Sequence, residues 1–235
     1  MSWRALALLA VVAAVSVPSA SGASISHGRA LFVDGCSTCH GLDARGIPDV
    51  APDLHGTGAL AADFYLSTGR MPLDNPGTEP ERSQPAYAPA EIDDLVAYIG
   101  SLGGPPIPQI DPSQGSLNVG LRAFTAHCAG CHQVVARGGA ITGGFAPSLR
   151  DATPTQIAEA VRLGPFLMPT FNRDEISDQT LASIISYVQF THHPDNRGGW
   201  GIFEIGPVPE GMIAWLLAGL VLLVVVRLIG ERNRE

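Results

Sequence analysis

Cysteine is scarce in this sequence, with only four among 235 residues. All four lie in two copies of one pattern, Cys36-Ser37-Thr38-Cys39-His40 and Cys128-Ala129-Gly130-Cys131-His132. No further pair remains for a structural disulfide, so the disulfide framework common in small exported proteins is excluded. The cysteines must therefore be explained by the CxxCH pattern itself.

Basic residues are also few: 14 Lys and Arg stand against 22 Asp and Glu, which gives a formal net charge of −8. This balance argues against binding to nucleic acid and against electrostatic attachment to anionic lipid. It favours protein partners with a basic or mixed-charge surface. The length fits two small domains better than one large domain.

The CxxCH pattern suits covalent attachment of a haem. Two cysteines three residues apart lie on one helical turn, so both sulfurs reach one edge of a flat macrocycle. The next residue, His40 or His132, then supplies the first axial ligand to the iron. A CxxC pair alone also fits a redox dithiol or half of a zinc site. Because the histidine recurs 92 residues later and no cysteine is left to complete a thiolate cage, we predict two covalently bound haem c groups.

Methionine is scarce as well, and its positions suggest the second axial ligands. Besides the initiator there are three, of which Met71 and Met168 each follow a CxxCH pattern and precede a proline. We predict these two as distal iron ligands. Met71 as a flexible core residue is one alternative, and His55 as the ligand is another. We further expect the carbonyl of Pro52 to fix the ring of His40.

The two halves of the chain repeat the same signals in the same order. A glycine and a phenylalanine precede each CxxCH by eight and four residues, an Ala-Pro-x-Leu stretch and a Met-Pro pair follow it, and an apolar helix face comes last. We predict helices over 26–34, 59–67 and from Pro89 in the first half, and over 155–163 and around 181–188 in the second. Repetition of five signals indicates a duplicated domain.

The ends and the middle of the chain complete the predicted organisation. Residues 1–23 have the basic start, short apolar run and small residues of a signal peptide, with a retained membrane helix as the alternative. The proline-rich segment 104–115 separates domains at 24–103 and 116–192. A juxtamembrane segment, 193–210, leads to a transmembrane helix at 211–229 and a tail at 230–235. A buried core helix is the alternative for 211–229. The arginines that follow this helix predict a cytoplasmic C-terminus and exported haem domains.

This order of parts resembles the class I cytochrome c fold. The expected fold is all-α, with two tandem class I cytochrome c domains followed by one C-terminal transmembrane helix. Together with the stretch Phe64–Pro72 and the glycine- and aromatic-rich segment 198–207, it resembles the dihaem cytochrome c subunit of the actinobacterial-type cytochrome bcc complex, a quinol–cytochrome c reductase. That resemblance implies cytochrome b and Rieske iron–sulfur subunits as partners. It also implies that electrons enter from the Rieske protein at the first haem and leave from the second to a haem-copper cytochrome c oxidase in the cell membrane.

Two other functions stay open at this point. A dihaem cytochrome can accept electrons within a membrane-bound dehydrogenase, and a dihaem peroxidase or thiosulfate dehydrogenase carries out chemistry at an iron with an open or unusual position. Iron held by both histidine and methionine has no such position, so we expect no substrate chemistry from this chain alone.

Overall fold

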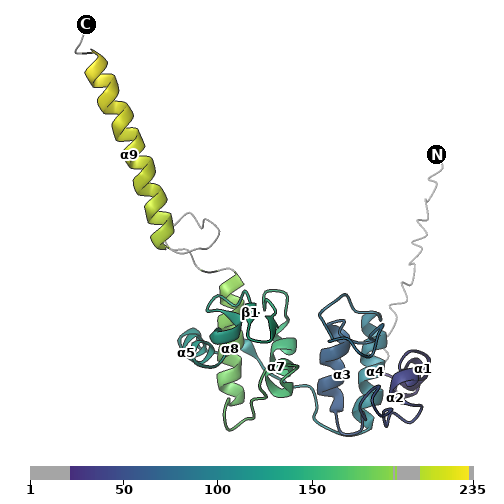
Figure 1. Ribbon diagram of the computed structural model, residues 1–235. Helices are drawn as coiled ribbons and strands as arrows, with labels where there is room; N and C mark the ends of the chain where they lie inside the picture. Colours follow the sequence, from purple (N-terminus) through teal and green to yellow (C-terminus); the bar gives the residue numbers. More distant parts are fainter. Residues whose placement is uncertain (1–21, 193, 195–206, 233–235) are drawn as a thin grey trace, which may run out of the picture. The chain divides into compact units, whose positions relative to one another are not determined.

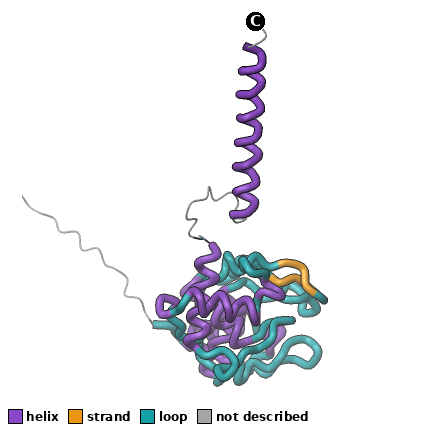
Figure 2. Tube along the Cα trace, turned by 90° about the vertical axis from the view of Figure 1, so that its left-hand side faces the viewer, coloured by secondary structure: helices purple, strands orange, loops and turns teal. Residues whose placement is uncertain are grey.

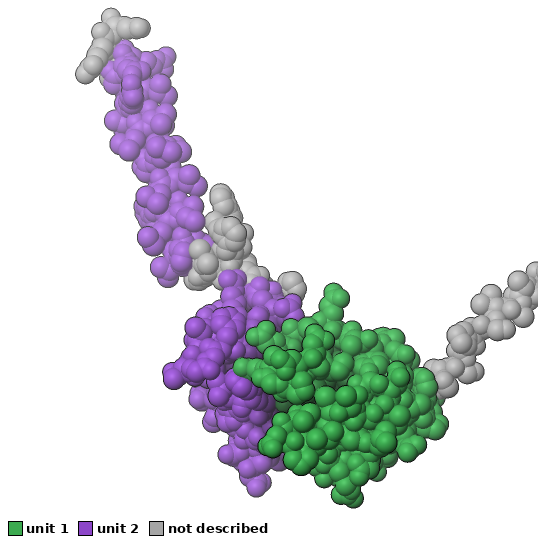
Figure 3. Space-filling model, turned by 45° about the vertical axis from the view of Figure 1, so that its right-hand side comes forward, with its two compact units in different colours: residues 1–107 green, residues 108–235 purple. Residues whose placement is uncertain are grey.

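The computed structural model describes residues 22–192, 194 and 207–232. The predicted signal peptide, apart from its last two residues, lies outside this range, as do most of the juxtamembrane segment and the end of the tail. The chain divides into two compact units, Met1–Ile107 and Pro108–Glu235 (Figure 3). Each unit is built mainly from helices joined by loops (Figures 1 and 2).

The helices of the first unit match the predicted ones closely. They are α1 (Ile25–Gly35), α2 (Ser37–His40), α3 (Gly58–Ser67) and α4 (Pro89–Ser101). Helix α4 begins with proline, whose fixed φ suits the first helical turn. The side chain of Glu91 accepts the backbone N–H of Ala88 at 2.9 Å, which satisfies one of the free donors at this helix end.

The first unit is organised by the contact between α1 and α4. Gly28 lies so close to the carbonyl of Asp94 that a Cβ atom has no room there. Four residues later, Phe32 meets Tyr98 with ring centroids 5.3 Å apart. The Gly-x-x-x-Phe spacing therefore lets the first and last helices of the domain approach closely and then fills the space beside the contact.

The second unit repeats this construction. Its helices are α5 (Leu117–His127), α6 (Ala129–His132), α7 (Pro154–Leu163) and α8 (Asp178–His192), preceded by a single 3-10 turn, η1 (Pro112–Gln114). Gly120 lies against the carbonyl of Ser183, and Phe124 meets Tyr187 at 5.4 Å between ring centroids. The angle between the two ring planes is 52° in both domains. This agreement supports the duplication inferred from the sequence.

The all-α expectation is wrong in one detail. Strands β1 (Gly139–Ile141) and β2 (Gly144–Ala146) form a short antiparallel hairpin in the second unit, drawn in orange in Figure 2. The corresponding loop of the first unit contains only an isolated bridge between Ile47 and Ala51. Between the histidine of the CxxCH pattern and the proline whose carbonyl it contacts, the chain advances 15 positions in the second unit and 12 in the first. The extra residues give the loop enough length to pair with itself.

The C-terminal helix α9 (Pro207–Arg232) has the length and composition of a membrane span. Within Val208–Arg232, an 18-residue window has a mean hydropathy of 2.7, and none of that window is buried within the described structure. A helix of 25 residues is about 38 Å long, more than the roughly 30 Å of a bilayer core. The observed helix starts four residues before the predicted span and ends three residues after it. Its exposure argues against the alternative of a buried core helix.

Candidate haem-binding sites

In each CxxCH pattern the first cysteine joins the preceding helix to a short helix, α2 or α6, that holds the other four residues. The N–H groups of Cys36 and Cys128 donate to the carbonyls of Phe32 and Phe124, both at 2.8 Å. The pattern thus continues the preceding helix, and its histidine N–H donates back to the carbonyl of the first cysteine. This arrangement lets two sulfurs and one imidazole reach a single flat haem.

Both candidate ligand histidines are oriented by a proline carbonyl. The ring Nδ1 of His40 lies 3.0 Å from the carbonyl oxygen of Pro52, and that of His132 lies 3.0 Å from the carbonyl oxygen of Pro147. A carbonyl only accepts, so Nδ1 carries the proton and Nε2 keeps its lone pair. The contact predicted for Pro52 is confirmed. In both domains the imidazole is held in the tautomer that binds iron through Nε2.

The protonation states also suit haem attachment better than the redox alternative. Burial raises the pKa of Cys128 to about 11, and the neighbouring Cys131 adds to this effect. Burial likewise raises the pKa of the Cys36 thiol, although a hydrogen bond with Tyr87 acts in the opposite direction. A redox dithiol needs a lowered thiol pKa. Burial lowers the pKa of His132, against the opposing effect of its bond to Pro147, so this imidazole is neutral at pH 7.

The zinc alternative gains no support from the described part of the chain. Over those residues, no three or more His, Cys, Asp and Glu side chains gather in a group that could hold a metal ion. The donor set present in each domain is instead one imidazole and one thioether, which is a pair that haem iron accepts.

The two methionines occupy matching places in their domains. Met71 is half-buried and packs against the first domain's core cluster, as Cys36 does. Met168 is half-buried against the second domain's cluster, which includes Cys128. Each domain therefore brings a cysteine of the CxxCH pattern and its candidate methionine ligand onto one apolar core. The assignment of Met71 and Met168 as iron ligands stays a prediction.

The alternative ligand, His55, contacts the carboxylate of Asp53. The backbone N–H of His55 donates to Asp53 Oδ1 at 2.8 Å, and its ring Nδ1 lies at the same distance from that oxygen. These two contacts lower the pKa of the Asp53 carboxyl. These contacts leave Nε2 of His55 unengaged, so the choice of Met71 over His55 stays a prediction.

The structure adds one residue that the sequence reasoning missed. The side chain of Arg162 on α7 donates from Nη1 to the carbonyls of Phe171 and Asn172 at 3.0 and 3.1 Å. Its Nη2 lies 2.7 Å from Asp178 Oδ1 at the start of α8. Arg162 therefore ties the chain that follows Met168 to the two neighbouring helices. Arginine at the end of an amphipathic helix looks like a surface residue in the sequence, so no local signal predicts this role.

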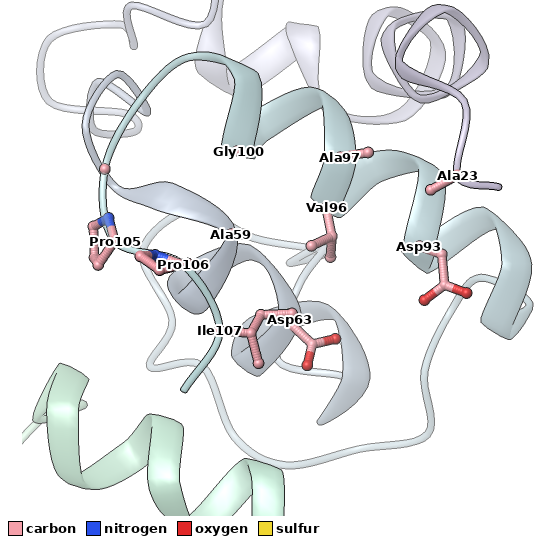
Figure 4. Close-up of a pocket in the computed structure, with 11 residues that line it drawn as sticks. Ala23, Ala59, Asp63, Asp93, Val96, Ala97, Gly100, Pro105, Pro106 and Ile107 are labelled. Atoms are coloured by element: carbon pink, nitrogen blue, oxygen red, sulfur yellow. The ribbon is translucent and has the colours of Figure 1, made fainter. Parts of the chain in front are cut away.

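A hollow on the first domain is separate from the haem-binding residues. It measures about 460 Å³ and lies over α3 and α4 and the segment up to Ile107 (Figure 4). Its lining is mostly alanine, glycine and proline, with the carboxylates of Asp63 and Asp93 beside it. None of the cysteines, histidines or methionines discussed above lines it, so it is not part of the candidate site.

Comparison with known proteins supports the two-domain interpretation. Residues 25–103 match the family model described as cytochrome c. Residues 115–188 match the model described as cytochrome c oxidase, cbb3-type, subunit III. Cytochrome c domains imply covalently bound haem c, and two such matches are consistent with two haems.

Similar curated proteins cover almost the whole chain. A cytochrome bc1 complex cytochrome c subunit from Mycobacterium bovis is 33% identical over 97% of this chain and 88% of its own length. Proteins with the same description from Mycobacterium leprae and Corynebacterium diphtheriae are 34% and 32% identical, each over 90% of this chain, covering 77% and 82% of their own lengths. A cbb3-type cytochrome c oxidase subunit from Rhodobacter capsulatus is 28% identical over 68% of this chain.

Proposed function

Because this chain belongs to the family of cytochrome c subunits of the cytochrome bc1 complex, we propose that it is a membrane-anchored dihaem electron carrier. It receives electrons from the Rieske iron–sulfur and cytochrome b subunits of a quinol-oxidising respiratory complex and passes them to a haem-copper cytochrome c oxidase. The observation that carries this proposal is the duplicated arrangement of cysteines, oriented histidine and half-buried methionine in two similar domains.

The residues of each domain have defined tasks in this proposal. The pairs Cys36/Cys39 and Cys128/Cys131 hold one haem c each through thioether bonds. The iron ligands are His40 with Met71 in the first domain and His132 with Met168 in the second. When bound, a haem with this ligand pair exchanges single electrons at a raised potential and offers no open position to a substrate.

The surrounding chain supports this task by packing. The pairs Phe32–Tyr98 and Phe124–Tyr187 fill the contact between first and last helices, and the apolar clusters around them form the core on which each candidate methionine packs. The proline carbonyls hold each imidazole in one tautomer, so electron exchange involves no change of histidine protonation. This combination suits electron transfer better than peroxidase or thiosulfate chemistry.

Helix α9 supplies the anchor in this proposal. Its apolar stretch is followed by Arg227 and Arg232, so the C-terminus faces the cytoplasm and both haem domains lie on the outer side of the membrane. This places them beside the exported parts of the respiratory partners. The net charge of −8 favours basic or mixed-charge surfaces on those partners.

Replacement of single methionines tests the ligand assignment. Met71→His and Met168→His should each leave two haems attached but lower one reduction potential and weaken the long-wavelength absorption of the iron–sulfur bond, because imidazole replaces a thioether. Met212→Leu, which changes the methionine in α9, is the matched control and should leave both haems unaltered. Unchanged spectra in both histidine variants would refute the distal assignment.

Co-purification tests the proposed respiratory partners of this chain. The tagged full chain, extracted in mild detergent, should bring with it cytochrome b, the Rieske protein and haem-copper oxidase subunits, and the preparation should oxidise quinol. Recovery of a flavin- or quinone-cofactor dehydrogenase in their place would overturn the proposal in favour of a dehydrogenase subunit.

A further inference from the structure

Arg70 stands directly before the candidate ligand Met71 and is held firmly in place. The N–H groups of both residues donate to the carbonyl of Tyr65, at 2.9 and 3.1 Å. The guanidinium lies over the ring of the buried Phe64, 4.9 Å from its centroid. Backbone and side chain are thus both fixed beside the first domain's methionine.

The charge of Arg70 has no counter-ion within the described part of the chain. Its Nη1 is buried and has no hydrogen-bond partner there. Burial, and the nearby charge of Arg82, lower the pKa of Arg70, yet a guanidinium remains protonated in proteins. The Arg70 side chain as a whole is half-buried, but its shielded Nη1 lacks the acceptor that a charged donor away from water needs. An anion beside Nη1 would supply that acceptor.

We infer that Arg70 donates from Nη1 to a carboxylate of the haem attached at Cys36 and Cys39, and so positions that haem and raises its reduction potential. The inference rests on the proposed function only in taking the first domain to carry a haem. Haem carboxylates are the anions that such a cofactor brings, and a guanidinium binds carboxylate in a fixed geometry. A haem carboxylate would fit here as the acceptor for Nη1 of Arg70, a shielded donor without a partner in the residue next to the candidate iron ligand Met71.

The second domain has no equivalent cation at this place. A glycine with φ near +65° ends the preceding helix in both domains, Gly69 (φ 65°) and Gly164 (φ 63°). Between this glycine and the methionine the first domain has Arg70 alone, whereas the second has Pro165, Phe166 and Leu167. The second haem is therefore a control within the same molecule.

The test uses the full chain with both haems attached. Arg70→Gln removes the charge and keeps a planar polar group, Arg70→Lys keeps the charge, and Arg82→Gln removes the exposed neighbouring charge. Spectroelectrochemical titration of the isolated protein should show a lower potential for one haem in Arg70→Gln, because a nearby cation disfavours the oxidised iron. The other haem should not change, Arg70→Lys should recover most of the shift, and Arg82→Gln should resemble the wild type.

A direct readout comes from infrared difference spectra between the oxidised and reduced protein. Carbon-13 labelling of the haem carboxylates should reveal bands that shift in Arg70→Gln but not in Arg82→Gln. Loss of thermal stability with unchanged potentials and unchanged carboxylate bands would reduce Arg70 to a packing role and overturn the inference. Equal shifts from Arg70→Gln and Arg82→Gln would also overturn it.

These measurements are independent of the respiratory partners. If the potentials and carboxylate bands respond as expected but cytochrome b and the Rieske protein do not co-purify, only the proposed function fails. If the partners co-purify and the haem count is two but neither readout responds, only the inference about Arg70 fails.

Discussion

Replacing Gly120 by alanine should push apart the two helices that define the second domain. A Cβ atom on this residue would lie 2.7 Å from the carbonyl carbon of Ser183 and 2.8 Å from Cβ of Tyr187. Ordinary carbon contacts are about 3.5–4.0 Å, so α5 and α8 must separate by close to an ångström. The obstacle is backbone as well as side chain, and it cannot simply rotate away.

The size of the effect follows from two opposing terms. Overpacking of a well-packed contact costs about 1–3 kcal/mol, and the backbone obstacle at Ser183 places Gly120→Ala at the upper end. Alanine in a helix gains about 0.5–1 kcal/mol over glycine. The net loss is about 2 kcal/mol, which lowers the melting temperature of a domain this small by about 8–16 °C. The separation also disturbs the Phe124–Tyr187 ring contact.

The fall in melting temperature of Gly120→Ala is measured by thermal unfolding, followed by circular dichroism and by haem absorption. Gly28→Ala should have a similar effect in the first domain, because its Cβ would meet the backbone of Asp94 and Leu95. Gly130→Ala is the matched control: no atom lies within 4 Å of its Cβ position, so it should be neutral or slightly stabilising. If Gly120→Ala unfolds at the same temperature as Gly130→Ala, the close helix contact does not exist.

Three further predictions concern stability. Thr153→Ala removes the side-chain cap of α7 and should cost about 1 kcal/mol in urea unfolding; no change would mean that the cap does not form in solution. Arg162→Gln breaks an ion pair in which the arginine side chain is 7% exposed and the Asp178 side chain is 47% exposed; it should cost about 2 kcal/mol, because the charged hydrogen bonds of Arg162 are lost with it, with a smaller loss in Asp178→Asn, measured in the same way. The N–H of Ser24 lowers the pKa of Asp94, so this carboxylate stabilises the first domain above its unfolded pKa of about 3.9. That stabilisation disappears as the pH falls through the lower folded pKa, and the acid-induced fall in melting temperature should be shallower in Asp94→Asn.

The sequence alone was sufficient to predict haem c as the cofactor and to place the main elements of the fold. The cysteines and the histidine of each candidate site are neighbours in the chain, so their spacing is enough to predict haem attachment. Helix ends followed from the 3.6-residue period and from local signals such as Pro89, and these depend on few distant contacts. The match between halves made the duplication visible, and the oriented histidine followed from the Ala-Pro-x-Leu stretch.

The hairpin and the surroundings of the methionines could not be predicted in this way. The loop after His132 is three residues longer than the loop after His40, but this length does not predict whether the loop forms a hairpin. Gly139 and Ala146 pair only after the loop has closed. Neither the shielded, unpartnered Nη1 of Arg70 nor the contacts of Arg162 to the chain after Met168 can be inferred from neighbouring residues. Each depends on how a later segment returns to an earlier helix.

The sequence by itself thus determined the two CxxCH patterns that predict haem attachment, where the helices lie and that the domain occurs twice. Tertiary structure decided how closely the first and last helices approach at Gly28 and Gly120, which charges become buried and what fixes each methionine segment. The physical reason is the range of the interactions: covalent attachment and helix formation act between neighbours in the chain, whereas burial and packing depend on residues that only folding brings together.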